Sequence, residues 1–263
     1  MSGPATVDRA LADEVVDRLG LTGLRPDGEG VAAFYGAWCR SIPFDNLRKL
    51  DALRTGAHPL PGDTPDDFFR AWLQHGTGGT CWASSGALGA LGALAVHLGF
   101  DAALVVGSML DLPEPNHGSV VIDVDGTVWL ADSSLLLGSP HRMVPEGSST
   151  RCRGYRSRLD PDGDTWMLVT DSPRGDLPCR LQPGPRTAEE YRERHERTRA
   201  ASVFNEAPHV QRHLDGTVHF LVDRDLVVWT EDGPTTTHLE EDARRRWLRE
   251  AGFSDAVVAA ALD

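Results

Sequence analysis

The sequence predicts an α+β fold in three parts: an N-terminal helical bundle, a central antiparallel β-barrel or sandwich, and a C-terminal α/β lid. Apolar residues recur at helical spacing through most of the first hundred positions, whereas from about residue 102 short runs rich in Val, Ile and Trp alternate with turn residues. At 263 residues the chain is long enough to bury a full core. We place the domain boundaries at residues 1–100, 101–201 and 202–263.

The first part contains three segments with helical signals before its cysteine. Apolar residues have helical spacing over residues 7–19 and 29–40. The Thr-Pro-Asp-Asp sequence at 64–67 combines a capping residue, a first-turn proline and acidic residues that face the helix dipole, so a helix is expected to start there and to end at Gly76. Ile42 is expected to be extended because it precedes a proline.

A turn of small residues at 76–80 precedes Cys81 and an Ala/Gly/Leu-rich segment that is expected to be helical to about His97. The first N–H groups of a helix lack intrahelical partners and carry the positive end of its dipole, so a thiolate of Cys81 would be stabilised there. Gly78 and Gly79 permit positive φ and a close approach of substrate to the backbone. Cys81 is therefore a candidate nucleophile, although a small buried thiol is the alternative interpretation. The expected apolar face of the helix comprises Leu88, Leu91, Leu94, Ala95 and Leu98.

A β-hairpin is predicted shortly after this helix. Apolar runs at 119–124 and 127–131 flank Asp-Gly at 125–126, the pair favoured in a two-residue type I′ turn. With that turn the register makes His117 and Asp132 diagonal neighbours on one face, with Cβ atoms about 7 Å apart. An imidazole-to-carboxylate hydrogen bond is then within reach.

The remaining elements follow in order. Further strands are expected at residues 102–106 and 166–170, and the Thr-Ala-Glu-Glu sequence at 187–190 has capping-box spacing and opens a charged helix to about residue 199. The last part is expected to contain strands at 217–222 and 226–230, a helix near 239–251 closed by Gly252, and a short final helix capped by Ser254.

Together Cys81, His117 and Asp132 form a complete set for thiol catalysis. In this arrangement His117 takes the thiol proton, Asp132 fixes the imidazole tautomer and Cys81 attacks as a thiolate. The hairpin accounts for the proximity of His117 to Asp132. Only the tertiary fold can bring Cys81 to His117.

These residues carry a resemblance to the arylamine N-acetyltransferase family. Residues 42–47, Ile-Pro-Phe-Asp-Asn-Leu, resemble the family's Ile-Pro-Phe-Glu-Asn-Leu, and residues 78–81, Gly-Gly-Thr-Cys, resemble its Arg-Gly-Gly-x-Cys. His117 and Asp132 fall where the family's His and Asp fall, and Ser-Val-Phe-Asn at 202–205 resembles its Ser-Pro-Phe segment. The resemblance spans most of the chain.

The resemblance implies the family's architecture, with a cysteine-protease-like core, and its reaction. An acetyl or other acyl group would pass from acyl-CoA through a thioester on Cys81 to an arylamine or similar amine. Acetyl-CoA or another acyl thioester would be the cosubstrate, with no metal and no bound cofactor. Phe44, Gly78, Gly79 and Phe204 would contact substrate, although a buried core aromatic is an equally good interpretation of Phe44.

The sequence also departs from the family pattern, and two alternatives stay open. Thr77 stands where the family usually has Arg, Ala83 and Ser85 where it has Glu and Asn, and residues 133–140 replace its usual Val-Gly-Phe-Gly. The altered loop would suit a chain-release amide synthase or cyclase that acts on an acyl chain bound to an acyl carrier protein. The second alternative is a non-catalytic homologue that binds small molecules.

Composition limits the partners. With 26 Lys plus Arg against 39 Asp plus Glu, the formal charge of −13 argues against nucleic acid or an anionic membrane. The four cysteines are scattered without metal-ligand or Cys-x-x-Cys spacing. Residues 1–7 lack the charged start and apolar core of a signal peptide, and no apolar run is long enough to cross a bilayer, so a cytoplasmic protein is expected.

Overall fold

The computed structural model of the chain describes residues 5–86, 90–172, 175–182 and 184–262. Its helices are α1 (Arg9–Leu19), α2 (Gly28–Ser41), α3 (Leu47–Thr55), α4 (Pro65–His75), the π-helix η1 (Trp82–Gly86), α5 (Ala90–His97), α6 (Ala188–Arg197), α7 (Glu241–Glu250) and α8 (Asp255–Leu262). Its strands are β1 (Phe44–Asp45), β2 (Asp101–Met109), β3 (His117–Val124), β4 (Thr127–Ala131), β5 (His141–Arg142), β6 (Ser148–Cys152), β7 (Tyr155–Asp162), β8 (Thr165–Thr170), β9 (Leu177–Leu181), β10 (His209–Leu214), β11 (Thr217–Val222), β12 (Asp225–Thr230) and β13 (Gly233–His238). The predicted α+β class is confirmed.

The N-terminal helices begin and end where side chains satisfy their free backbone groups. The Thr64 hydroxyl accepts a hydrogen bond from Asp67 N at 3.0 Å, and Gly76 ends α4 in the left-handed conformation, which confirms both predicted boundaries. Asp27 caps α2 by accepting from Gly30 N at 2.8 Å. Ile42 follows α2 in an extended conformation, as the next residue, a proline, requires.

The central sheet is antiparallel, with strand order β5-β4-β3-β2-β9-β8-β7-β6. The predicted hairpin between β3 and β4 is confirmed: Val124 pairs with Thr127, and Val120 pairs with Ala131. Asp125 and Gly126 both have positive φ, 51° and 78°, as a type I′ turn demands. The register that brings His117 toward Asp132 is therefore the one adopted.

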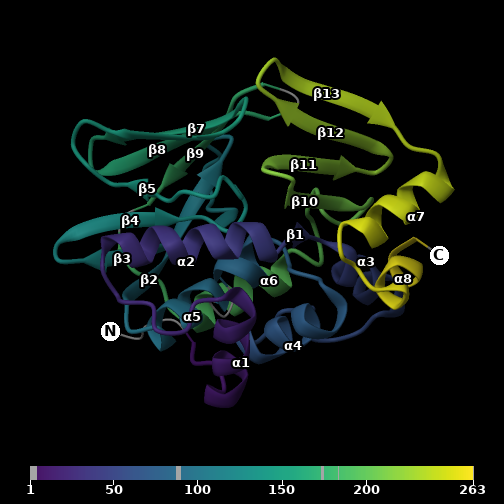
Figure 1. Cartoon of the computed structure of the whole chain (residues 1–263), viewed down its shortest axis with the longest axis horizontal. Helices are drawn as coiled ribbons and strands as arrows, with labels where there is room; N and C mark the ends of the chain where they lie inside the picture. Colours follow the sequence, from purple (N-terminus) through teal and green to yellow (C-terminus); the bar gives the residue numbers. More distant parts are fainter. Residues whose placement is uncertain (1–4, 87–89, 173–174, 183, 263) are drawn as a thin grey trace.

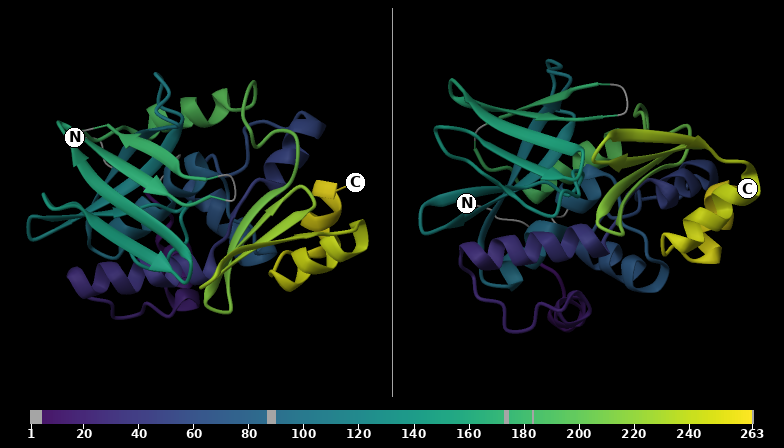
Figure 2. Two further views of the ribbon diagram at one scale, coloured as in Figure 1. Left: turned by 90° about the horizontal axis from the view of Figure 1, so that it is seen from above. Right: turned by 45° about the horizontal axis from the view of Figure 1, so that its top comes forward.

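A second antiparallel sheet, of order β1-β10-β11-β12-β13, takes its first strand from the N-terminal region. In that strand Phe44 pairs with Gln211. Figures 1 and 2 show the two sheets side by side, with α7 and α8 at the outer end of the smaller sheet. Because α3 packs on α8, the segment after β1 is fixed against the C-terminal part of the chain.

Three apolar clusters hold these layers together. The largest joins α1, α2, α4 and α5 to the inner faces of β2 and β3, with Trp38 stacked on Phe68 at a centroid distance of 5.8 Å. A second fills the space between the sheets around Tyr155, and a third joins α3, α7 and α8 to the smaller sheet around Leu248. In the part of the chain that the structure describes, no helix has the length and apolar character needed to cross a bilayer.

Candidate active site

Cys81 lies at the start of a helix, as predicted. The Thr80 carbonyl accepts from Ala83 N and Ser84 N, both at 2.9 Å, which closes the first turn around Cys81. The helix then continues through the wider turn of η1, a difference from the regular helix that was expected. Of the predicted apolar face, Leu91, Leu94 and Ala95 are buried, Leu98 is partly buried, and Leu88 lies outside the described residues.

Close packing of η1 on β3 brings Cys81 to His117. A Cβ atom on Gly118 would lie 3.0 Å from the Trp82 ring and 2.8 Å from the Tyr191 ring, so only glycine allows this approach. Trp82 and Tyr191 pack edge to face at 5.1 Å, and the Tyr191 hydroxyl accepts a hydrogen bond from Ser119 N at 3.2 Å. These contacts hold the start of the helix against β3, and the side chains of Cys81 and His117 are hydrogen-bonded.

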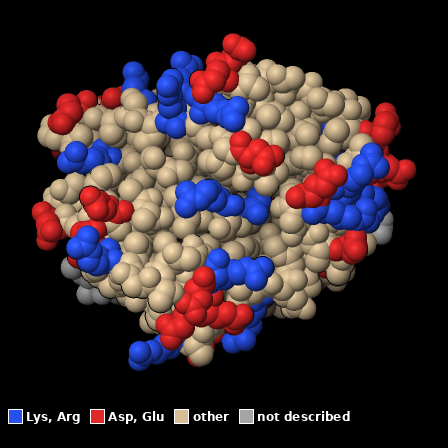
Figure 3. Space-filling model, viewed as in Figure 1, with Lys and Arg blue, Asp and Glu red and all other residues tan. Residues whose placement is uncertain are grey.

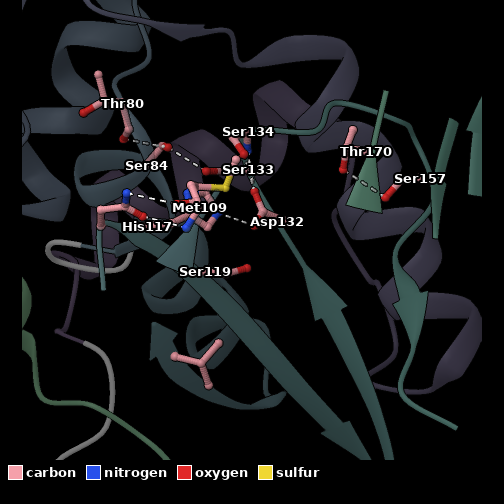
Figure 4. A network of polar contacts seen from close by, with 12 residues as sticks. Thr80, Ser84, Met109, His117, Ser119, Asp132, Ser133, Ser134, Ser157 and Thr170 are labelled. Atoms are coloured by element: carbon pink, nitrogen blue, oxygen red, sulfur yellow. Dashed lines mark hydrogen bonds and ion pairs between the residues drawn. The ribbon is translucent and has the colours of Figure 1, made fainter. Parts of the chain in front are cut away.

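His117 and Asp132 form a buried pair. His117 Nε2 donates to Asp132 Oδ2 at 2.6 Å, and the two side chains are only 6% and 0% exposed. Figure 4 places Ser133 and Ser134 beside Asp132, and Ser134 donates to Oδ1 from both its backbone N–H, at 2.9 Å, and its hydroxyl, at 2.6 Å. Because Nε2 is used for Asp132, the second ring nitrogen, Nδ1, is left for the Cys81 sulfur.

The charges of this pair stabilise each other against the cost of burial. Burial disfavours the imidazolium of His117, but the Asp132 carboxylate and the neighbouring Cys81 hold its pKa well above the ordinary range. Burial likewise disfavours the Asp132 carboxylate, but His117 and the hydrogen bonds from Ser134 keep the pKa of this carboxyl below its usual value. The Asp132 carboxylate thus stabilises the protonated imidazole of His117.

Further hydrogen bonds tie the pair to its surroundings. The Tyr35 hydroxyl, from α2, donates to the Asp132 carbonyl at 2.6 Å. The hydroxyl groups of Ser84 and Ser133 lie 2.6 Å apart, and that of Ser84 also donates to the Thr80 carbonyl at 3.0 Å (Figure 4). The turn that carries Cys81 is therefore linked directly to the loop that carries Asp132.

The glycines before Cys81 are fixed by the protein's own packing. Neither Gly78 nor Gly79 has positive φ, so the turn does not use the backbone freedom that glycine permits at these positions. A Cβ atom would lie 1.8 Å from the Pro43 carbonyl oxygen at Gly78 and 2.7 Å from the Ala83 side chain at Gly79. The absence of a side chain thus allows the turn to lie directly against its neighbours.

Asp45, one residue after Phe44, anchors the same turn. Its Oδ2 accepts from Gly78 N at 2.6 Å, its Oδ1 accepts from Leu47 N at 3.1 Å, and its own N–H donates to the Gly79 carbonyl at 3.3 Å. Burial raises the pKa of Asp45 to about 6, although these hydrogen bonds and nearby arginines oppose the shift. This residue belongs to the Ile-Pro-Phe-Asp-Asn-Leu motif, and its hydrogen bonds hold the turn at residues 76–80, which precedes Cys81, in position.

Phe44 and Phe204 come together beside that turn. Their rings pack edge to face at 5.4 Å with an interplanar angle of 67°. Phe44 forms an isolated backbone bridge to Gly79, and the Asn46 side-chain amide donates to the Phe204 carbonyl at 3.0 Å. The structure therefore unites the four residues that were expected to contact substrate, Phe44, Gly78, Gly79 and Phe204, next to Cys81.

Sequence reasoning did not single out Tyr35, Ser84, Ser133 or Ser134. For Ser134 a local signal existed, because an aspartate side chain commonly accepts from the backbone N–H two residues later. The others act across long sequence separations, such as the 97 positions between Tyr35 and Asp132, and no local pattern marks them. Within the described parts of the chain, no group of three or more His, Cys, Asp or Glu side chains could hold a metal ion.

Comparison with known proteins identifies the family. A family model described as N-acetyltransferase matches residues 31–253, and the chain therefore belongs to the N-acetyltransferase family. Its fold is that of the arylamine N-acetyltransferases. No curated protein matches the chain in sequence.

Three solved structures illustrate this similarity of fold. The arylamine N-acetyltransferase of Mycobacterium smegmatis is 23% identical with a TM-score of 0.77, over 95% of this chain and 97% of that one. The enzyme of Salmonella typhimurium is 20% identical with a TM-score of 0.75, over 96% and 98%. The Mycobacterium marinum enzyme in complex with CoA is 18% identical with a TM-score of 0.76, over 95% and 98%.

Proposed function

We propose that this protein transfers an acetyl group from acetyl-CoA, through a thioester on Cys81, to an arylamine or similar amine. The observation that carries the proposal is the buried, hydrogen-bonded series of Cys81, His117 and Asp132 in a chain of the N-acetyltransferase family. A nucleophile, a base within hydrogen-bond reach and a group that orients the base are what thiol catalysis requires.

In the first half-reaction the Cys81 sulfur attacks the carbonyl carbon of the thioester. His117 Nδ1 takes the thiol proton, the new carbon–sulfur bond forms and the bond to the CoA sulfur breaks, and the proton leaves with CoA. In the second half-reaction the amine nitrogen attacks the carbonyl carbon of the acetyl group on Cys81. The carbon–nitrogen bond forms, the carbon–sulfur bond to Cys81 breaks, and His117 carries the proton from the nitrogen to the Cys81 sulfur. Asp132 holds the imidazole in the orientation that both steps use.

The acceptor is expected to lie against Phe44 and Phe204. Phe44, which is 7% exposed, and the partly buried Phe204 form an apolar, aromatic pair beside the turn that carries the nucleophile. The backbone of Gly78 and Gly79, packed against Pro43 and Ala83, would form the adjoining wall. An aromatic amine matches the chemistry of this surface.

Acetyl-CoA is the preferred donor over an acyl carrier protein. The family match supports an acetyltransferase, and one enzyme of the same fold was solved in complex with CoA. An acidic carrier protein would need a broad positive surface, but on the face in Figure 3 basic and acidic side chains are interspersed, and the net charge is −13. Chain release from a carrier and non-catalytic binding receive no support from the comparisons.

Initial-rate kinetics with acetyl-CoA and a neutral arylamine test this proposal. A thioester intermediate requires CoA to leave before the amine reacts, so double-reciprocal plots at several amine concentrations should be parallel. Intersecting lines would mean that both substrates must be bound at once, which contradicts transfer through Cys81. Release of CoA without acetylated amine would contradict the proposed acceptor.

A further inference from the structure

The chain contains a single lysine, and it is buried near Cys81. Lys49 lies in the first turn of α3, while every other basic side chain among the 26 Lys and Arg residues is arginine. It is only 5% exposed, and its Nζ has no hydrogen-bond partner among the described residues. A buried ammonium without a partner is costly, so a ligand that supplies negative charge is the natural complement.

The groups around Lys49 do not supply that charge. Cys81, Glu196 and Arg199 are the neighbouring groups that act electrostatically on its ammonium, and Cys81 carries no charge once it is acetylated. The Glu196 carboxylate already accepts from Leu60 N at 3.1 Å and pairs with Arg199 at 2.6 Å and with His58 at 3.2 Å. Its charge is therefore largely taken up by other partners.

His195, near the end of α6, is another neighbour of Lys49. Its Nε2 donates to the Pro61 carbonyl at 3.0 Å, which leaves the buried Nδ1 as a neutral acceptor without a partner among the described residues. Burial lowers the pKa of His195 to about 4, and the charge of Lys49 acts in the same direction. A neutral imidazole cannot balance the ammonium.

The same turn of α3 is fixed against the aromatic pair of the candidate acceptor site. Asn46, three residues before Lys49, donates to the Phe204 and Ala207 carbonyls at 3.0 and 2.8 Å, and its side-chain oxygen accepts from His209 N at 2.7 Å. Phe44 precedes Asn46 and bridges to Gly79. Cys81, the Phe44–Phe204 pair and Lys49 thus belong to one rigidly connected region.

We propose that Lys49 binds the carboxylate of a substrate that reaches Cys81, and that this substrate is an aromatic amine whose ring packs on Phe44 and Phe204. The inference deepens the proposed function and rests on it. An aminobenzoate-like acceptor would present its carboxylate to the ammonium, its ring to the phenylalanines and its amine to the acetylated cysteine. The same ammonium would also accept a carboxylate carried by the acyl group of the donor.

The protonation state of Lys49 suits this task at neutral pH. Burial lowers the pKa of Lys49 to about 8, against the opposing influence of Cys81 and Glu196, so the ammonium still predominates at pH 7. A bound carboxylate stabilises the charged form and raises the pKa. Selectivity for an anionic acceptor is therefore expected to be lost as the pH rises through about 8.

Because there is only one lysine, its side chain can be observed directly. Protein grown with lysine labelled at the ε-carbon gives one side-chain signal, which is titrated with pH alone, with 4-aminobenzoate and with the neutral 4-aminobenzamide, in the absence of acetyl-CoA. We expect 4-aminobenzoate to raise the midpoint by about one pH unit or more and 4-aminobenzamide to leave it unchanged. This measurement does not depend on catalysis.

Kinetics with a matched pair of variants give the second readout. The ratio of kcat/KM for 4-aminobenzoate to that for 4-aminobenzamide is expected to fall about tenfold or more in Lys49→Met and to be retained largely in Lys49→Arg. Arg54→Met, which removes an exposed charge from the same helix, should keep the wild-type ratio. Lys49→Met should not lower the melting temperature, since it removes a buried unpaired charge.

The outcomes separate the sources of the carboxylate. If 4-aminobenzoate has no effect on the signal, but succinyl-CoA loads Cys81 about tenfold faster than acetyl-CoA and Lys49→Met abolishes the difference, the carboxylate comes from the acyl group and the role of Lys49 stands. If neither carboxylate depends on Lys49, or if Lys49→Met slows both amines equally, the inference is overturned. Acetylation of 4-aminobenzamide through Cys81 would leave the proposed function intact in that case.

Discussion

Replacing Asp132 by asparagine tests how the catalytic pair works, because the surrounding hydrogen bonds dictate the orientation of the new amide. Oδ1 of Asp132 accepts from the Ser134 N–H at 2.9 Å and from its hydroxyl at 2.6 Å, so the amide oxygen must stay at that position. The amide NH2 then replaces Oδ2, which lies 2.6 Å from His117 Nε2. Since NH2 can only donate, Nε2 must become an acceptor.

The imidazole proton is thereby moved to Nδ1, the nitrogen that must receive the proton of Cys81. The variant retains the shape of the site but has lost its base. In Ser-His-Asp triads the same Asp-to-Asn change lowers turnover by about 10⁴-fold, which corresponds to about 5.5 kcal/mol in the activation barrier. Burial lowers the pKa of His117, and the Asp132 charge is the main effect that raises it. Without that charge the pKa of His117 is expected to fall.

Quenched single-turnover acetylation by acetyl-CoA measures this loss at the first chemical step. Asp160→Asn is the matched control, because it removes a carboxylate from an exposed ion pair with Arg158. The control should acetylate Cys81 at the wild-type rate. If Asp132→Asn stays within about tenfold of wild type, Asp132 does not set the tautomer and the reasoning from Ser134 fails.

Three further predictions concern the groups that support the site. Ser134→Ala removes one hydrogen bond to the Asp132 carboxylate and should lower kcat/KM by about tenfold to a hundredfold without unfolding the protein; an unchanged value would make that hydroxyl dispensable. Gly78→Ala places a Cβ 1.8 Å from the Pro43 carbonyl oxygen and should cost about 3 kcal/mol or more of unfolding free energy in denaturant titrations, whereas a cost below about 1 kcal/mol would show that the turn relaxes. Burial raises the pKa of Asp45 to about 6, above its unfolded value, so the stability it contributes is present below about pH 4 and lost as the pH rises through about 6. The difference in unfolding free energy between wild type and Asp45→Asn should therefore fall by roughly 2 kcal/mol from pH 4 to pH 7, and a constant difference would contradict this.

Local signals were sufficient where one turn or one cap decides the structure. The Asp-Gly pair at 125–126 fixed the register of β3 and β4, and with it the approach of His117 to Asp132. The capping sequence at 64–67 similarly located the start of α4. In both cases a few adjacent residues determine the backbone conformation by themselves.

Other elements depend on tertiary contacts that no short segment reveals. β7, β9 and β13 contain Pro161, Pro178 and Pro234, which weaken a strand signal because proline cannot donate to a sheet. α3 has a charged sequence and no side-chain cap, and packing on α8 stabilises it. The burial of Lys49 was invisible for the same reason.

The joining of Cys81 to His117 is also a tertiary effect. It depends on Gly118 allowing Trp82 and Tyr191 to approach β3, and on Asp45 holding the cysteine turn from a distant segment. The family resemblance implied that Cys81 lies beside His117, but the periodicity and spacing of the residues did not predict it. Residues that act through such contacts are found from the structure alone.

The thioester on Cys81 is tested most directly by the mass of the intact protein after brief mixing with acetyl-CoA in the absence of amine. Wild type and the control Cys152→Ala, which removes a buried thiol of the second apolar cluster, should each gain the mass of one acetyl group, mapped in wild type to the peptide that contains Cys81. Cys81→Ala should gain none, and addition of an arylamine should return the acetylated protein to its original mass. An acetyl group that persists in Cys81→Ala, or wild-type protein that acetylates an amine without ever carrying the acetyl group itself, would contradict transfer through this cysteine.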